Sequence, residues 1–191
     1  MPSQLSLFAG AKALPEGFKY RPGVISAAEE HALLEHVRGL PFKEFQFHGY
    51  VGKRRVVSYG WHYDFSERAL REVEDIPPFL LPLREVAARF AELAPADLQH
   101  VLVTEYGPGT AIGWHKDKAV FGDVIGISLL SPCVFRLRRK NGETWERVSL
   151  TAEPRSAYLL RGPSRTEWEH SIPAVDALRY SVTFRNVLAK G

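Results

Sequence analysis

The stretch CVFRLRRKNGETWERVSL, residues 133–150, contains a strong signal for antiparallel structure. Its central residues, Lys140-Asn141-Gly142-Glu143, predict a β-hairpin turn, because Asn-Gly accepts the positive φ angles of a type I′ turn. We therefore expect two strands, over residues 133–139 and 144–150, that pair with each other.

Strand-like segments continue on both sides of this hairpin, and helical segments precede them. The further expected strands span residues 99–106, 123–130, 156–161 and 178–187. One helix is expected to begin at a capping box formed by Ser26 and Glu29 and to end at Gly39, and a second to begin near Pro82. Two helices followed by about eight short strands predict an α+β fold: a jelly roll, or double-stranded β-helix, with the helices packed outside the sheet.

The N-terminal half adds a period-two stretch and an arm. Apolar and polar residues alternate between positions 42 and 63, and Gly49-Tyr50-Val51-Gly52 within this stretch predicts a turn. Residues 1–22, which are rich in glycine and proline, are expected to form an extended arm. We expect residues 23–191 to form a single domain.

The composition limits the classes of protein to consider. Apolar residues make up 45% of the 191 residues, and no apolar run approaches the roughly 18 residues that span a bilayer. The N-terminus lacks the pattern of a secretory signal, and the single Cys133 excludes an internal disulfide and a multi-cysteine zinc site. We therefore expect a cytoplasmic protein without a membrane span, and a monomer. A net charge of +3 favours a polyanionic partner such as nucleic acid.

The segment Gly113-Trp114-His115-Lys116-Asp117 carries a candidate metal-binding pair. In an extended segment, positions i and i+2 point the same way, so His115 and Asp117 can reach one metal ion together. His170 is the best candidate for a third ligand. Two imidazoles and one carboxylate on one face leave positions open for a 2-oxo acid and oxygen, which is the arrangement of non-haem Fe(II) oxygenases. A His-x-Asp pair also occurs by chance in many chains.

A strand follows the third candidate ligand after nine residues. In Arg179-Tyr180-Ser181-Val182-Thr183-Phe184-Arg185 the apolar residues form one face and the polar residues the other. An exposed strand could show the same alternation. If the polar face lines the barrel interior, however, Arg179 and Arg185 enter the metal cavity, where arginine is suited to hold a carboxylate through two parallel hydrogen bonds.

The combined pattern resembles the AlkB family of Fe(II)- and 2-oxoglutarate-dependent dioxygenases. The resemblance covers roughly residues 99–187, and the N-terminal half more loosely. It depends on the His-x-Asp pair, the later histidine, the closing strand with its two arginines, and the segments Tyr106-Gly107-Pro108-Gly109 and Ser164-Arg165. The resemblance implies that residues 99–191 form the jelly-roll catalytic core and that residues 23–98 recognise the substrate.

The resemblance also implies roles for the residues of the core. The three candidate ligands would hold Fe(II), Arg179 would pair with the distal carboxylate of 2-oxoglutarate, and Arg185 would lie near the metal-bound carboxylate end. Tyr106 would donate its hydroxyl to the cosubstrate. Thr104 and Ser181 stand where asparagine is common in the family, and both can still form hydrogen bonds there.

The implied reaction consumes O₂ and 2-oxoglutarate, yields succinate and carbon dioxide, and hydroxylates a C–H bond. On an N-methyl group of DNA or RNA the product would collapse to formaldehyde and the free amine, as in DNA repair. Ala119 stands where the bacterial repair enzymes typically have an acidic residue near the target base. The resemblance therefore does not imply that this chain acts on the same bases as the bacterial repair enzymes.

Candidate substrate-binding residues lie in the N-terminal half. Basic residues with interleaved aromatics suit phosphate contacts and base stacking. The candidates are Lys53, Arg54, Arg55, Tyr59, Trp61 and Tyr63, of which the three aromatic residues are expected to share one strand face. A solvated turn beside a half-buried strand would look the same. A second basic run near the hairpin consists of Arg136, Arg138, Arg139 and Lys140, and it could contact phosphates or simply be solvated.

These observations lead to one principal hypothesis and two alternatives. The principal one is an oxygenase that dealkylates bases in single-stranded DNA or RNA, since a duplex would require base flipping. A close variant would oxidise a wobble modification of transfer RNA, or a protein side chain. The alternative of another class is a non-catalytic jelly-roll binding module, which would have no need for a 2-oxoglutarate clamp.

Overall fold

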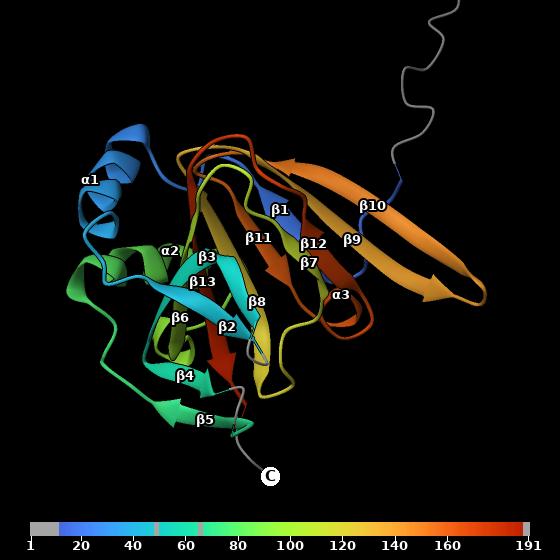
Figure 1. Cartoon of the computed structure of the whole chain (residues 1–191), viewed down its shortest axis with the longest axis horizontal. Helices are drawn as coiled ribbons and strands as arrows, with labels where there is room; N and C mark the ends of the chain where they lie inside the picture. The colour runs from blue at the N-terminus through green and yellow to red at the C-terminus, as the bar shows by residue number, and fades with distance from the viewer. Residues whose placement is uncertain (1–11, 48–49, 65–66, 189–191) are drawn as a thin grey trace, which may run out of the picture.

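The computed structural model describes residues 12–47, 50–64 and 67–188, and Figure 1 shows its arrangement of helices and strands. The strands are β1 (Lys19–Arg21), β2 (Lys43–Phe47), β3 (Tyr50–Tyr59), β4 (Trp61–Asp64), β5 (Ala69–Glu72), β6 (His100–Tyr106), β7 (Ile112–His115), β8 (Phe121–Leu129), β9 (Cys133–Asn141), β10 (Thr144–Ala152), β11 (Ala157–Leu160), β12 (Glu169–Ile172) and β13 (Arg179–Val187). The helices are α1 (Ala27–Val37), α2 (Leu81–Ala91) and α3 (Pro163–Thr166), with short 3₁₀ turns η1 (Pro78–Leu80) and η2 (Pro95–Asp97).

Two antiparallel sheets form the body of the domain. The major sheet has the strand order β1-β11-β8-β13-β6-β3-β2, and the minor sheet has the order β10-β9-β12-β7. Apart from the consecutive pairs β2–β3 and β9–β10, neighbouring strands are separated in the sequence, because from β6 onward the chain passes repeatedly from one sheet to the other. This is the predicted jelly roll, with a separate two-stranded sheet, β4-β5, attached beside it.

Helices α1 and α2 cover the outer face of the major sheet. Helix α1 begins at the predicted capping box, in which the Ser26 hydroxyl accepts from the Glu29 amide at 3.1 Å and the Glu29 carboxylate accepts from the Ser26 amide at 2.6 Å. Both helices lie on one side of the molecule, and the β9–β10 hairpin extends from the other (Figure 1). The apolar side chains of β13, Tyr180, Val182 and Phe184, pack in the same core as these helices. The polar side chains of β13 therefore face the space between the two sheets, as predicted.

The predicted hairpin is confirmed. Strands β9 and β10 pair from Asn141↔Thr144 to Cys133↔Ala152, and Gly142 has a φ of +61° in the turn. Helix α2 begins where expected, and it ends at Ala91 because Glu92 takes a left-handed conformation with φ of 56°.

Three expectations for the N-terminal half need comment. Part of the predicted turn at 49–52 lies outside the described residues, and Val51 and Gly52 belong to β3. The arm contributes β1, which pairs with β11 at the edge of the major sheet. The expected common face of Tyr59, Trp61 and Tyr63 is wrong, because β3 ends at Tyr59 and the chain turns at Gly60, with φ of +78°.

No helix among the described residues is long and apolar enough to cross a membrane.

Candidate metal centre

Two strands of the minor sheet place the candidate histidines side by side. Strand β7 ends at His115, strand β12 carries His170, and these two residues are direct partners in the antiparallel pair. Side chains of directly opposed residues lie on the same face of a sheet. The two imidazole rings accordingly face the space between the sheets with their centroids 4.2 Å apart.

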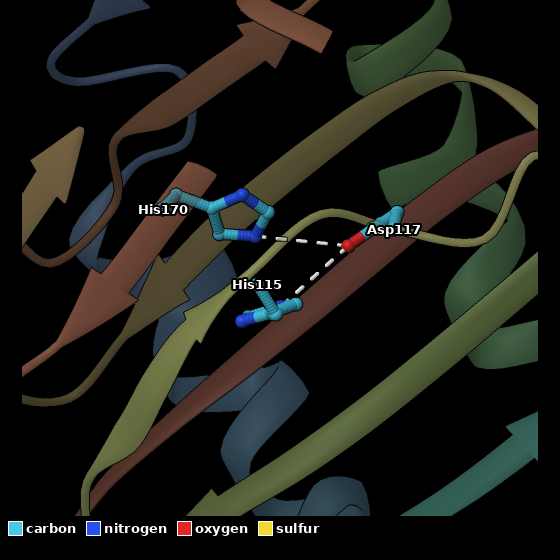
Figure 2. A group of neighbouring side chains, drawn as sticks. All are labelled: His115, Asp117 and His170. Carbon is cyan, nitrogen blue, oxygen red and sulfur yellow. Dashed lines mark ion pairs between the residues drawn. The ribbon is translucent and has the colours of Figure 1, made fainter. Parts of the chain in front are cut away.

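Asp117 completes the cluster from a loop. Its carboxylate Oδ1 lies 3.7 Å from His115 Nε2 and 3.6 Å from His170 Nε2 (Figure 2). One potential ligand atom from each residue lies within 4.8 Å of the others. Because β7 ends at His115, the loop beyond the strand directs the Asp117 carboxylate, rather than the strand alternation that we expected.

The surroundings of Asp117 keep it ionised. Burial would raise the pKa of its carboxyl, but Arg185 first, then His170 and His115, lower that pKa well below its usual range. Arg185 Nε donates to Asp117 Oδ2 at 2.6 Å, and the carboxylate side chain is only 6% exposed. The site therefore presents a fixed negative charge at neutral pH.

Each of the two histidines has a ring nitrogen that could bind a metal ion. Burial, followed by the proximity of His115, lowers the pKa of His170 to about 3, so its imidazole keeps a free lone pair at neutral pH. His115 Nδ1 lies 2.8 Å from the carbonyl oxygen of Gly113. A proton on Nδ1 donates to that carbonyl and leaves Nε2, the nitrogen that faces Asp117, available to a metal ion.

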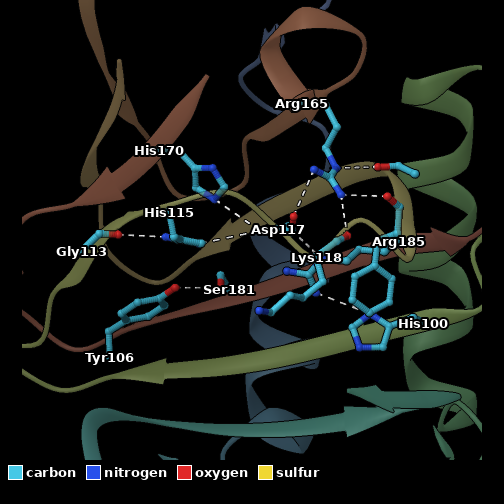
Figure 3. A network of polar contacts seen from close by, with 12 residues as sticks. His100, Tyr106, Gly113, His115, Asp117, Lys118, Arg165, His170, Ser181 and Arg185 are labelled. Carbon is cyan, nitrogen blue, oxygen red and sulfur yellow. Dashed lines mark hydrogen bonds and ion pairs between the residues drawn. The ribbon is translucent and has the colours of Figure 1, made fainter. Parts of the chain in front are cut away.

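Arg165 holds the loop that carries Asp117. Its buried guanidinium donates to four backbone carbonyl oxygens, at 2.7–3.3 Å, as Figure 3 shows in part. These carbonyls belong to Asp117, Lys118, Phe121 and Gly122. Arg165 was part of the family pattern but had no predicted role. Its carbonyl partners lie more than 40 positions away in the sequence, so no pattern near Arg165 could reveal them.

The major sheet supplies the opposite wall with a group of polar residues. Arg179 is the direct partner of Tyr106 across β13 and β6, and Ser181 is the partner of Thr104. Arg179 is 2% exposed, and its Nη2 donates to the Ser128 hydroxyl at 2.9 Å. The hydroxyl oxygens of Tyr106 and Ser181 lie 3.5 Å apart. The structure therefore brings together in this wall four of the five residues predicted to bind the cosubstrate, all but Arg185, and it adds Ser128.

Arg179 has unsatisfied hydrogen-bonding capacity. Its guanidinium carbon lies 4.5 Å from the centre of the Tyr106 ring, while Nε and Nη1 are buried without a hydrogen-bond partner. Buried donors without partners are rare in native structures, and a buried cation is costly unless it is paired. A carboxylate that enters this cavity would satisfy both donors, so the cavity fits one end of 2-oxoglutarate as well as the triad fits Fe(II).

Arg185 lies beside the candidate metal ligands, and its role near the metal-bound end of the cosubstrate stays a prediction. It pairs with the metal-ligand candidate Asp117, and its Nη1 lies 3.5 Å from Nδ1 of the buried His100. Burial first, and then Arg185, lowers the pKa of His100 well below its usual range, so the ring beside the guanidinium stays neutral. No local pattern around His100 indicates this role.

The basic residues of β3 divide between its two faces. Arg55 Nε donates to Glu105 at 2.7 Å on the face away from the cavity. Arg54 lies on the opposite face, with its guanidinium 3.9 Å from the centre of the Phe45 ring. Burial lowers the pKa of Arg54, while Tyr106 and Asp117 oppose this shift and Arg185 adds to it. Arg54 is therefore close enough to these cavity residues to interact with them electrostatically. Lys53 is exposed.

The three aromatic candidates also separate. Tyr59 is 5% exposed and packs in the core beneath the helices, so it is not available to a substrate. Trp61 and Tyr63 lie half-buried on β4. The ammonium of Lys118 lies 5.4 Å from the centre of the Tyr63 ring, so Tyr63 borders the loop after Asp117.

The chain is similar to several known proteins. Residues 17–185 match the model of the family described as the 2OG-Fe(II) oxygenase superfamily. The Arabidopsis thaliana protein named Alkylated DNA repair protein ALKBH8 homolog is 29% identical over 80% of this chain and 49% of its own length. The Bos taurus Alpha-ketoglutarate-dependent dioxygenase alkB homolog 7, mitochondrial, is 30% identical over 80% of this chain and 65% of its own length.

Two further similarities extend the comparison. The Mus musculus tRNA (carboxymethyluridine(34)-5-O)-methyltransferase ALKBH8 is 28% identical over 85% of this chain but only 25% of its own length. The chain thus spans between a quarter and two thirds of these relatives. The solved structure of OsALKBH1 superimposes with a TM-score of 0.66 over 93% of this chain and 100% of that chain, at 17% identity, which shows the shared fold.

Proposed function

The chain belongs to the 2OG-Fe(II) oxygenase superfamily and is AlkB-like, and on this basis we propose that it oxidises alkyl groups carried by nucleic-acid bases. It is an Fe(II)- and 2-oxoglutarate-dependent dioxygenase. When bound, iron, 2-oxoglutarate and O₂ supply the oxidising chemistry, which yields succinate and carbon dioxide and places one oxygen atom in a substrate C–H bond. The observation that carries the proposal is the metal triad beside a buried arginine with two unsatisfied donors.

One group of residues would bind the iron, and two arginines support its ligands. His115, Asp117 and His170 would hold the iron through two neutral imidazoles and one carboxylate. Arg185 keeps the Asp117 carboxylate charged and directed toward the histidines. Arg165 fixes the backbone of the same loop, so the ligand geometry exists before any metal arrives.

The opposite wall would position the cosubstrate. Arg179 Nε and Nη1 would donate to its distal carboxylate, while Ser128 anchors the third nitrogen of the same guanidinium. The hydroxyls of Tyr106, Ser181 and Thr104 lie along the same wall and can donate to the remaining oxygens.

The charge around the cavity favours an anionic substrate. Arg54, beside the cavity, has a ring contact with Phe45 and forms no ion pair with any described residue. The exposed Lys53 lies next to it on β3, and the side chain of His115 is 37% exposed, which marks the open side of the metal site. A single-stranded nucleic acid can present a base there without the cost of flipping it from a duplex. After hydroxylation of an N-methyl group, the N–CH₂OH product would release formaldehyde and leave the N–H base.

A second candidate reaction is the oxidation of a side chain on a transfer-RNA wobble uridine. It is supported by the similarity to the mouse protein whose name refers to carboxymethyluridine 34 of tRNA. Ala119, which stands two positions after Asp117, also differs from the acidic residue typical of the bacterial repair enzymes. Hydroxylation at carbon would give a stable product and no formaldehyde.

The two reactions are distinguished by their products. Iron-loaded protein is incubated with 2-oxoglutarate, ascorbate and a panel of methylated single-stranded DNA, methylated RNA and total tRNA, and succinate and formaldehyde are quantified. Formaldehyde equal to succinate with one methylated substrate is the expected result. Succinate with a 16 Da gain on tRNA, and no formaldehyde, would replace the first reaction by the second. Neither product on any nucleic acid, from protein shown to hold iron, would refute both.

A further inference from the structure

The outer face of the minor sheet carries an unusual set of side chains, which we call the basic–aromatic face: Trp114, Arg136, Arg138, Lys140, Trp145 and Arg147. The sheet register places these residues together, since Arg138 pairs with Arg147 and Lys140 pairs with Trp145 across β9 and β10. The alternate residues of β9, such as Phe135 and Leu137, are buried between the sheets on the metal side. The basic–aromatic face therefore points away from the metal cavity.

Cations and indole rings alternate across this face. The guanidinium of Arg138 lies 4.4 Å from the Trp114 ring centre and 4.2 Å from the Trp145 ring centre. Arg136 lies 5.0 Å from Trp114 on one side, and the Lys140 ammonium lies 5.1 Å from Trp145 on the other. These contacts hold the planar groups in a ladder that runs from the hairpin to the edge strand β7.

The face is strongly positive. The one carboxylate that the register places among these residues belongs to Glu169, and Arg138 Nε already donates to it at 2.6 Å. Arg147 and Lys140 are exposed and form no ion pair with any residue in the described part of the chain. A groove of about 860 Å³ lies alongside, lined by Lys12, Trp114, Arg136, Arg147 and Ser149 among others.

We propose that the basic–aromatic face binds a single-stranded segment of the nucleic acid on which the enzyme acts, outside the part that enters the metal site. Cations complement the phosphates, and Trp145, which is 39% exposed, offers a ring on which a base can stack. Trp114 directly precedes the metal ligand His115 on the edge strand, so a strand that follows the ladder arrives beside the open side of the site. The inference that the bound molecule is a nucleic acid rests on the proposed function.

Three strand spacings of about 4.8 Å separate β10 from β7, so the ladder spans roughly 14 Å. At about 3.4 Å per stacked nucleotide this corresponds to about four nucleotides. A labelled oligouridine of 15 residues is therefore long enough to cover the face and to reach the metal site.

The test measures binding of this oligouridine to the full chain by fluorescence anisotropy at several salt concentrations. We expect Lys140→Glu/Arg147→Glu to weaken binding at least tenfold and to reduce the salt slope by about 1.4, the value for two lost phosphate contacts on a single strand. Trp145→Ala should weaken binding on the order of tenfold and leave the salt slope unchanged. Thermal unfolding of each variant verifies the fold.

The matched control is the double variant Arg38→Glu/Arg89→Glu. It reverses two exposed cations, one at the C-terminal end of α1 and one in the last turn of α2, on the other side of the molecule. It should change the dissociation constant less than twofold. Equal binding by the control and by Lys140→Glu/Arg147→Glu, or no binding of oligouridine by the wild type, would overturn the proposal.

Turnover separates this proposal from the proposed function. With a methylated mononucleoside, succinate formation should be the same for the wild type and Lys140→Glu/Arg147→Glu, whereas with a long methylated RNA the variant should have a raised KM. If the wild type binds RNA through this face but oxidises no nucleic acid, the proposed function is refuted and the proposal that the face binds nucleic acid stands. Normal oxidation with an unchanged KM in the variant would refute the face alone.

Discussion

Replacement of Arg179 by methionine tests whether its two free donors await a carboxylate. Methionine is of similar length, keeps the buried apolar stem contacts and removes all the donors. The structure shows Nε and Nη1 buried without partners, and Nη2 bonded only to Ser128. A hydrogen bond to a charged group contributes about 1.5–3 kcal/mol, so the loss of two such bonds to 2-oxoglutarate should cost about 3–6 kcal/mol. The dissociation constant of 2-oxoglutarate should therefore rise by about 10² to 10⁴.

The assay is isothermal titration of 2-oxoglutarate into iron-loaded protein without oxygen. Arg179→Lys, which retains the charge but presents a point donor in place of the planar fork, should give an intermediate dissociation constant. The iron content should be unchanged in both variants. In the absence of 2-oxoglutarate, the free energy of unfolding of Arg179→Met should stay within about 1 kcal/mol of the wild type or exceed it, because an unpaired buried cation is removed. Equal 2-oxoglutarate affinity in Arg179→Met and the wild type would refute the clamp.

Three further predictions concern the metal ligands and the loop that supports them. Asp117→Asn should reduce bound iron from about one per chain to near zero in equilibrium dialysis, because it removes the anionic ligand; retention of iron would remove Asp117 from the site. Arg165→Met should lower the free energy of unfolding by about 3–5 kcal/mol in urea, since four backbone acceptors lose their donor; a loss below 1 kcal/mol would contradict this role. The pKa of His170 is about 3 when folded and 6.5 when unfolded, so the unfolded chain takes up the proton first as pH falls. His170 should thus contribute no destabilisation of the metal-free protein above pH 6.5 and a loss of about 1.4 kcal/mol per pH unit below it, in addition to the loss that the buried His100 causes in the same direction; His170→Gln should reduce the slope by about 1.4 kcal/mol per pH unit, and an unchanged slope would exclude a buried neutral imidazole at this position.

Much of the fold followed from local patterns in the sequence. The Asn141-Gly142 turn fixes the register of β9 and β10, and the capping box at Ser26 fixes the start of α1. The alternation in residues 179–185 assigned one face to the core and one to the cavity, as the structure has it. Such signals act over a few residues, so they can be recognised without knowledge of the rest of the chain.

The parts that were missed depend on contacts between distant segments. At Gly60 a Cβ atom would lie 2.0 Å from the carbonyl oxygen of Gln99, so this backbone contact requires glycine at the point where the chain leaves β3 of the major sheet and enters β4. The roles of Ser128, Arg165 and His100 are set by the strands and loops that pack against them, and no local pattern marks them. The same cause separates Tyr59 from Trp61, because one belongs to the core and the other to a separate sheet.

The most direct test of the central claim is the conversion of isotopically labelled 2-oxoglutarate to succinate, followed by mass spectrometry with methylated RNA and total tRNA as substrates. The account predicts one succinate per oxidised base with the iron-loaded wild type, and none with Asp117→Asn. Succinate formed equally by Asp117→Asn, or none formed by the wild type with its iron in place, would contradict the assignment of the catalytic centre to this cluster.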